Sequence, residues 1–488
     1  MYDWSNSRLC GLRLPNTLVL SQRRATTLVP VPALASPHAR FEIEAYAAVR
    51  QEPLRKVDVV VVGAGLSGLK AAWEVQKAGL SCIVVEARDR VGGKTLSVSP
   101  LGDERAVDLG GAWINDTNQS EIFKLAQTLG LKLVVQKADG DVIYEDFDSD
   151  LGRAAYGDTP DTFVEPNAAE KIQLLTEELE KACHELDIRD PASTGKDLDK
   201  LTLSEWATTK TSSMSALAML QLSTRALMGI EPSETSGFMR MRYDMKHGGQ
   251  HLRFVKGSQS VSLGLVDLLH RNSVVLSSPV SKSRTRGDFL CQRVILSVQT
   301  ILYKSIAFDP PLPSLKLELA KHGVQSFSYK HVIMYSEPWW RNAGLSGAFI
   351  SFKGPVSTAR DTSNDRVGQF SLTCFANGDL GRQMSKRPKA ERTKAILDHL
   401  DWVFSPYVEV PKPIAVVQRS WSKDLWSRVC TMPVQPPGIM SLQEHALRAP
   451  HGKIHFVGTE TSYEWAGYMD GAARSGDRGA KEVIHALI

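Results

Sequence analysis

The amino-acid sequence predicts an α/β fold in which one domain is assembled from separated segments and a second, α+β domain is inserted into it. Residues 57–86 have the pattern of a complete βαβ unit: a strand, a glycine-rich turn, a helix and a second strand. Another strand, glycine turn and helix pattern ends the chain in residues 452–487. Helical periodicity, as in 168–186, and strand-like runs, as in 331–335, lie between them. These patterns together predict a discontinuous, Rossmann-type dinucleotide-binding domain.

Three glycines follow the first strand of the βαβ unit, and each has its own structural reason. Gly63 permits the tight turn out of the strand, Gly65 lets the backbone approach a pyrophosphate, and Gly68 lets the helix pack against the sheet. The helix that begins at Leu66 and Ser67 would hold the pyrophosphate at its N-terminus, because unpaired N–H groups and the helix dipole favour an anion there.

The end of the second strand and the segment after it indicate which dinucleotide binds. Glu86 ends that strand, where a carboxylate accepts hydrogen bonds from a ribose diol and repels a phosphate, so NADP is disfavoured. Residues 88–97 have the sequence RDRVGGKTLS, which resembles the RxGGRxxS/T signature of flavoproteins of the amine oxidase and glutathione-reductase-like groups. This resemblance implies FAD rather than NAD. Lys94 stands where these flavoproteins usually have Arg, so a point charge replaces a planar, bidentate side chain.

The C-terminal segment sharpens the resemblance. Residues 458–472 have the sequence GTETSYEWAGYMDGA, which is similar to the motif GTETxxxWxGYMxGA of the flavin monoamine oxidases. In that family the helix that begins near Met469 faces the flavin pyrimidine carbonyl and stabilises negative charge on the reduced ring. Tyr468 would form one wall of the family's aromatic cage, and the alternative is an ordinary core aromatic.

The segment before residues 436–438 (PPG) implies two more site residues when it is aligned without gaps. Cys430 falls on the cysteine that, in animal monoamine oxidases, is joined covalently to the flavin 8α carbon. The alternative is a small buried hydrophobic residue, which is the usual state of a free cysteine. Thr431 stands where the second aromatic of the cage belongs, so that half is missing unless Trp426 or a neighbouring aromatic fills the space. The open wall favours a bulkier substrate, such as a secondary amine or an indole-derived metabolite.

Two further residues are implied by the middle of the chain. The family has a lysine that holds a water near flavin N5, and Lys304 resembles it although it stands one place early in an ungapped alignment. The alternative is a plain surface lysine. Val280, in a predicted strand at 278–280, matches the residue whose backbone meets adenine.

The predicted site is therefore extensive. The predicted catalytic residues are Lys304, Thr431 and Tyr468, and no metal site is predicted. The predicted cofactor-binding residues are Gly63, Gly65, Leu66, Ser67, Gly68, Glu86, Ala87, Arg88, Gly92, Gly93, Lys94, Gly110, Gly111, Ala112, Trp113, Val280, Cys430, Gly458, Glu460, Tyr468 and Met469.

The predicted FAD-binding domain and substrate domain alternate along the chain. The expected segments are an N-terminal extension, expected to be poorly ordered, at 1–55; three parts of the FAD-binding domain at 56–120, 247–311 and 414–488; and two parts of the substrate domain at 121–246 and 312–413.

The resemblance implies an FAD-dependent oxidase that removes hydride from the carbon next to an amine nitrogen, gives an imine, and passes the electrons to O₂ to form peroxide. Its partners would be a small-molecule amine and O₂. One alternative is an FAD-dependent oxidocyclase or dehydrogenase of a secondary-metabolite pathway, in which hydride abstraction is followed by intramolecular bond formation. Another is a non-catalytic flavin-fold interaction protein, although the sequence shows no tower-like helical insertion, reader motif or basic patch.

Composition narrows the remaining classes. A formal net charge of +4 on 488 residues gives no case for nucleic acid as a partner. No apolar run reaches the roughly 18–20 residues of a membrane span, so no transmembrane anchor is expected. The 6 cysteines are scattered without a CxxC pair, which favours a reducing compartment and a cytoplasmic location. A mitochondrial transit peptide in the arginine-containing residues 1–40 is the alternative, but prolines there favour a disordered extension.

Overall fold

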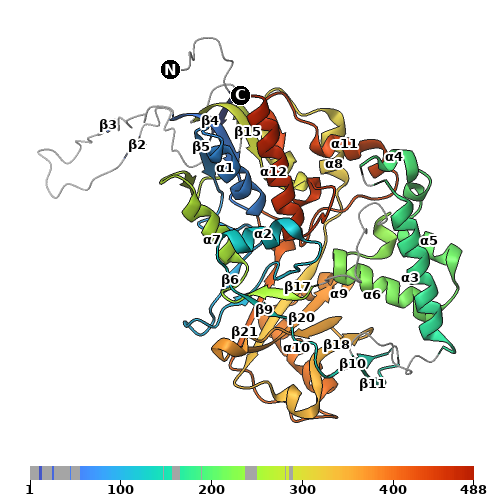
Figure 1. Ribbon diagram of the computed structural model, residues 1–488. Helices are drawn as coiled ribbons and strands as arrows, with labels where there is room; N and C mark the ends of the chain where they lie inside the picture. Colours follow the sequence, from blue (N-terminus) through green and yellow to red (C-terminus); the bar gives the residue numbers. More distant parts are fainter. Residues whose placement is uncertain are drawn as a thin grey trace, which may run out of the picture.

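Two large β-sheets organise the protein (Figure 1). One has 8 strands and the other has 7. The structure, a computed structural model, describes residues 10–13, 25–26, 44–45, 55–146, 148–155, 165–187, 189–236, 250–280, 282–284 and 289–488.

The eight-stranded sheet is built around the first strand of the βαβ unit. Its order is β13 (Val274–Val275), β5 (Cys82–Val85), β4 (Arg55–Val62), β15 (Phe289–Leu296), β1 (Cys10–Arg13), β14 (Lys282–Arg284) and β16 (Ala307–Phe308), and β22 (Ile454–Phe456) also pairs with β15. β4 runs parallel to both β5 and β15. A parallel strand covered on both faces needs a continuous apolar run, and residues 59–62 of β4 are accordingly four buried valines.

Two helices from opposite ends of the chain pack side by side on this sheet, as Figure 1 shows: α1 (Leu66–Lys77) and α12 (Met469–His485). Their close approach depends on Gly476. A Cβ atom at that position would lie 2.4 Å from the carbonyl oxygen of Ser67, which is closer than two such atoms can come. The absence of a side chain therefore lets the two backbones touch.

The seven-stranded sheet forms the core of the second domain. Its order is β11 (Leu151–Ala155), β10 (Asp141–Glu145), β18 (Leu345–Ser351), β19 (Thr358–Asp361), β20 (Phe370–Asn377), β17 (Ser328–Tyr335) and β21 (Ala415–Ser420). Helix α10 (Lys389–Phe404) packs on one face, where Leu400 and Phe404 are completely buried against Ile333 and Leu372. On the opposite face, Val332 and Met334 pack against Val107 and Leu109, and other residues of that face line a cavity.

A helical group and several short elements complete the fold. Helices α3 (Ala168–Glu185), α5 (Leu203–Lys210) and α6 (Met214–Met228) bury Leu175, Trp206 and Leu220 in a common core. The other helices and strands are β2 (Ala25–Thr26), β3 (Glu44–Ala45), β6 (Ser97–Val98), β7 (Val107–Asp108), β8 (Trp113–Ile114), α2 (Ser120–Thr128), β9 (Leu133–Val135), α4 (Pro191–Thr194), β12 (Leu252–Phe254), α7 (Gln259–Leu268), α8 (Ser314–His322), α9 (Gly378–Lys386) and α11 (Met440–Arg448).

The predicted fold class is confirmed, and two details differ from expectation. Residues 278–280 are not a strand, because the strand in this region is β13, four residues earlier. β9 pairs with β12, which joins residues 133–135 of the predicted substrate domain to the second predicted FAD-domain segment. Most of the predicted extension at 1–55 lies outside the described residues, and the segment boundaries stay predictions. In the part of the chain that is described, no helix has the length and apolar character to cross a membrane.

We expect Gly476→Ala to lower the free energy of unfolding by about 1–3 kcal/mol, because the new methyl group overpacks the contact between α12 and α1. Chemical denaturation followed by circular dichroism measures the change. Lys481→Ala is the matched control, since it places alanine in the same helix where the side chain is 74% exposed. Equal stability of Gly476→Ala and the control would show that the helices do not need this close contact.

Candidate active site

A cavity of about 510 Å³ lies between the eight-stranded sheet and the face of the seven-stranded sheet opposite α10. The turns that follow β4 and β5 line it, together with the N-termini of α1 and α12. Ligands of open α/β sheets bind at the carboxyl ends of the parallel strands, and the cavity has that location.

The cavity brings together nearly all of the residues predicted from the sequence. The predicted residues that line it are Gly63, Gly65, Leu66, Ser67, Glu86, Ala87, Arg88, Gly92, Gly93, Lys94, Gly110, Gly111, Ala112, Trp113, Val280, Cys430, Thr431, Gly458, Glu460, Tyr468 and Met469. Gly68 and Lys304 do not line it. The structure shows that these residues line the same cavity. The catalytic or cofactor-binding role of each residue stays a prediction.

Gly68 has a packing function instead of a place on the cavity surface. A Cβ atom there would lie 2.0 Å from the carbonyl oxygen of Gly63. Gly68 therefore lets α1 approach the turn, which is the reason the sequence indicated for it, and its place among the cofactor-binding residues stays a prediction.

Lys304 does not line the cavity, although its near neighbours Leu302 and Ser305 do, so its catalytic role stays a prediction without support from this arrangement. It is exposed on the short 3₁₀ helix Thr300–Ser305, in which Ile301, Leu302 and Tyr303 are buried. Because those three side chains occupy the inner side, Lys304 is turned toward solvent. Ser305, the next residue and the one that an ungapped alignment places at the lysine position, lines the cavity.

One end of the cavity has the shape and polarity for a pyrophosphate. Gly65 precedes α1, and a Cβ atom built on it would meet no protein atom within 4 Å. The open space therefore begins directly at the backbone, beside the N–H groups of the first helical turn. Gly63, with φ of +102°, makes the turn that exposes this end, and a Cβ atom there would clash with Ser297.

Glu86 is held rigidly beside this helix end. Its Oε2 accepts a hydrogen bond from the backbone N–H of Ala64 at 2.7 Å, and its Oε1 accepts one from the N–H of Arg88 at 2.9 Å. Each carboxylate oxygen has a second lone pair. The buried carboxylate can therefore also accept hydrogen bonds from a ribose diol at the cavity edge.

A network of loop contacts holds Tyr468 at the opposite end, where α12 begins. The Thr459 hydroxyl donates to the carbonyl of Tyr468 at 2.8 Å and accepts from the N–H of Gly467 at 2.7 Å. The ring of Trp465 packs edge-on against that of Tyr468, with centroids 5.2 Å apart. These contacts aim the N-terminus of α12 and the Tyr468 ring at the cavity.

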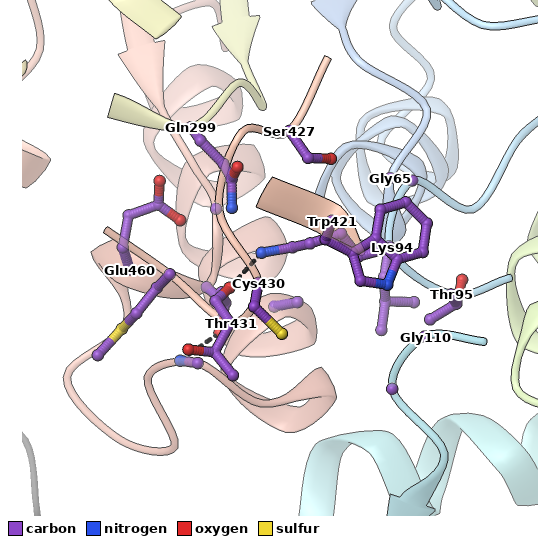
Figure 2. A pocket seen from close by; sticks show the side chains of 18 of the residues that line it. Gly65, Lys94, Thr95, Gly110, Gln299, Trp421, Ser427, Cys430, Thr431 and Glu460 are labelled. Carbon is purple, nitrogen blue, oxygen red and sulfur yellow. Dashed lines mark hydrogen bonds between the residues drawn. The ribbon is translucent and has the colours of Figure 1, made fainter. Parts of the chain in front are cut away.

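Cys430 lies on the loop between these two ends, and Figure 2 shows the Lys94 side chain reaching the same loop. The Lys94 ammonium donates to the carbonyl oxygen of Thr431. Burial raises the pKa of the half-buried Cys430 thiol, while the charges of Lys94 and Lys330 oppose that rise. Burial also lowers the pKa of Lys94. The lysine therefore anchors the loop that contains Cys430 and Thr431 and is not a fully solvated cation.

The remaining side of the cavity consists of residues that sequence reasoning missed. We call this side the sheet wall, and it is formed by Ser328, Lys330, Thr358, Arg360, Phe375 and Asn377. On each strand the two members are separated by one residue, so they point to the same face. Strand alternation was visible in the sequence, but nothing in it indicated which face of these strands would meet the cofactor domain.

The Lys330 side chain fixes the sheet wall to the cofactor domain. Its ammonium donates to the carbonyl oxygens of Asp108 at 3.0 Å and Gly110 at 2.7 Å. It also lies 5.1 Å from the centroid of the Trp113 ring, which packs 6.1 Å from that of Phe375. Burial lowers the pKa of Lys330 to about 8.

These features fit FAD and define a flavoprotein oxidoreductase. The open backbone at Gly65 and the α1 N-terminus suit the pyrophosphate, Glu86 suits the ribose, and the α12 N-terminus suits the electron-accepting ring. Residues 66–484 match the family described as flavin containing amine oxidoreductase. The chain therefore belongs to this family and is an FAD-dependent enzyme of amine oxidation.

Similar proteins share this fold over most of their length. The chain is 28% identical to the probable flavin-containing monoamine oxidase A of Dictyostelium discoideum, over 88% of this chain and 98% of that protein. It is 30% identical to amine oxidase [flavin-containing] B of Bos taurus, over 88% and 87% respectively. The solved structure of cyclohexylamine oxidase from Brevibacterium oxydans has a TM-score of 0.81 at 25% identity, covering 89% of this chain and 100% of that one. Putrescine oxidase bound to putrescine has a TM-score of 0.80 at 25% identity, with coverage of 89% and 100%.

We expect Gly65→Val to fold but to purify without the yellow colour of FAD. A Cβ atom at this position meets no protein atom within 4 Å, and the branched valine side chain fills the space that the pyrophosphate needs. Absorbance at the flavin bands and circular dichroism measure cofactor content and folding. Ala78→Val, which places the same side chain at the other end of α1, is the control and should keep its FAD. A Gly65→Val protein with the full FAD content would exclude this end of the cavity as the pyrophosphate site.

Proposed function

We propose that this enzyme oxidises a small-molecule amine at the sheet-wall side of the cavity and passes the electrons to O₂, forming peroxide. The observation that carries the proposal is one cavity whose lining includes the turn at Gly65 and three aromatic residues, Trp113, Phe375 and Tyr468. FAD, when bound, supplies the two-electron acceptor for the C–H bond next to the amine nitrogen. The protein's own task is to bind that bond in place and to exclude water.

The cavity lining favours the neutral form of the amine, which is the form that can lose a hydride equivalent. Removing hydride from a carbon next to an ammonium group would build up a second positive charge. Trp113 and Phe375 desolvate the amine, and desolvation lowers an amine pKa. The positive charge of Lys330 near both rings, 5.1 Å and 5.5 Å from their centroids, acts in the same direction. These residues therefore promote loss of the amine proton before oxidation.

The aromatic cage implied by the family resemblance lacks one of its two rings, and this leaves room for a larger substrate. Tyr468 and Thr431 both line the cavity, and Thr431 is the residue that the family resemblance aligns with the second ring of the cage. Trp426 also lines the cavity, but it is 38% exposed and lies at the solvent edge. The space above Thr431 supports a bulky or secondary amine, including indole-derived compounds, as the substrate.

The position of Cys430 supports a covalent link to the flavin. The residue lines the cavity, and the charges of Lys94 and Lys330 partly oppose the rise in its thiol pKa that burial causes. The other cysteines with described side chains are buried thiols, and none is in a disulfide. This thiol state also supports the proposal of a reducing, cytoplasmic location.

Purified holoenzyme should form peroxide with at least one amine from a panel of primary arylalkylamines and their bulkier N-alkyl derivatives. Thr431→Tyr narrows the cavity, so it should shift the kcat/KM ratio toward the small primary amines by about 2- to 30-fold. Peroxide detection measures both results, and Thr208→Tyr on the exposed face of α5 is the control. Absence of peroxide with every amine would contradict the oxidase proposal. An unchanged substrate ranking in Thr431→Tyr would show that residue 431 does not limit the substrate space.

Acid precipitation should leave the yellow colour in the protein pellet of the wild type and release it from Cys430→Ala, because only the first has a thioether to the flavin. The absorbance of the supernatant measures free FAD. Cys183→Ala, a buried cysteine of α3 away from the cavity, should behave like the wild type. Free FAD in the wild-type supernatant would refute the covalent link and leave the amine oxidation unaffected.

A further inference from the structure

The sheet wall presents an arginine to the cavity. Arg360 and Thr358 are the two cavity-lining residues of β19, and both are half-buried, whereas the alternate residues Ala359 and Asp361 are buried on the other side. The register places Thr358 opposite Phe375 of β20, which is itself opposite Lys330 of β17. Arg360 therefore belongs to the same surface as the aromatic and cationic side chains of the substrate region.

The guanidinium of Arg360 is positioned but not neutralised. It donates to the side-chain oxygen of Gln250 at 3.0 Å and lies 5.9 Å from the centroid of the Trp113 ring. The adjacent carboxylate of Asp361 points away from the cavity, where it binds Arg341 at 2.8 Å and accepts a hydrogen bond from Trp340 at 3.0 Å. Among the described residues, the guanidinium donates to Gln250 and pairs with no carboxylate, so most of its five N–H donors have no anionic partner there.

A second cation reinforces this positive charge. The Lys330 ammonium lies over the same Trp113 ring, and two of its three N–H groups are used by backbone carbonyls. Within the described residues, two acidic side chains line the cavity, and neither belongs to the sheet wall: Glu86 lies beside α1, and Glu460 accepts a hydrogen bond from the N–H of Thr300. The substrate region is therefore electropositive.

A half-buried cation is costly to desolvate unless a ligand supplies the opposite charge. A carboxylate satisfies this requirement best, because the guanidinium fork can donate to both of its oxygens. A second ammonium group, as in a diamine, would instead be repelled by both Arg360 and Lys330.

We propose that the amine substrate of this enzyme carries a carboxylate group and that Arg360 binds it, with Gln250 holding the guanidinium in place. The inference rests on the proposed function and specifies its substrate class as amino carboxylates. Arg360 thereby determines specificity, because it binds the carboxylate of the substrate. The amine group of the same substrate then faces the cofactor domain.

A titration tests carboxylate binding without turnover. Benzoate is added to holoenzyme, and the change in the flavin absorption spectrum gives its Kd. Arg360→Leu should weaken benzoate binding by about 10- to 100-fold, the scale of a lost charge-assisted hydrogen-bond pair. Arg360→Lys should restore part of the affinity because it keeps the charge, and Arg105→Leu, which removes a surface arginine, should leave the Kd unchanged.

A turnover assay tests the substrate class. The kcat/KM values of phenylalanine and 4-(aminomethyl)benzoate are compared with those of their methyl esters, which differ by the loss of the negative charge. The wild type should prefer the acids, and Arg360→Leu should reduce that preference at least 10-fold, mainly through KM, while the rates with the esters change less. These two acids place the carboxylate at different distances from the amine.

The results separate the two proposals. Arg360-dependent benzoate binding in an enzyme that oxidises no amine would refute the proposed oxidase function and leave the carboxylate site standing. Benzoate binding that is absent, or equal in the wild type and Arg360→Leu, would overturn the carboxylate site, as would a wild-type preference for the esters over both acids, even if peroxide is formed from neutral amines.

Discussion

The contact between α1 and α12 is the constraint on which the site depends. Gly476 lets the two helices touch, and Gly479 similarly lets α12 approach Val457 just after β22, where a Cβ atom would lie 2.2 Å from the valine side chain. This packing turns the N-terminus of each helix toward the same cavity, although α1 begins at Leu66 and α12 begins at Met469. Two helix dipoles from opposite ends of the chain can therefore act on one elongated ligand that is rich in negative charge.

Electrostatics then divide the cavity into regions with different tasks. The helix N-termini suit the anionic parts of the cofactor, and Glu86 suits its ribose. The sheet wall contributes Arg360 and Lys330 beside aromatic rings. The positive charges of Arg360 and Lys330 repel an ammonium ion and so favour the neutral amine. The same charges attract a carboxylate, so they favour a substrate that carries one at some distance from its amine. Neutral-amine chemistry and acid recognition therefore follow from one distribution of charge.

Hydrogen bonds between segments far apart in the sequence keep these regions in register. Arg88 links the turn after β5 to the loop that carries Cys430, because it pairs with Asp424 at 2.5 Å and donates to Ser427 at 2.8 Å. Lys330 makes the corresponding link from the sheet wall to the loop at Asp108 and Gly110. The Lys330 ammonium is buried and donates to two backbone carbonyls, so separating the sheet wall from the cofactor domain would leave it without these partners. The geometry of the cavity is thus built into the fold.

The sequence by itself determined the dinucleotide turn at Gly63 and Gly65, the carboxylate of Glu86, and the motif around Tyr468, because these features depend on the local backbone conformation of contiguous residues. Ungapped alignment also placed Cys430 and Thr431 at the cavity. Tertiary structure alone decided the rest. It buried Ile301, Leu302 and Tyr303 and left Lys304 exposed outside the cavity lining, because the buried side of a short helical turn is chosen by the core it packs against. It also brought Arg360 into the site, since every strand alternates between two faces and only the packing of the two domains decides which face meets the substrate.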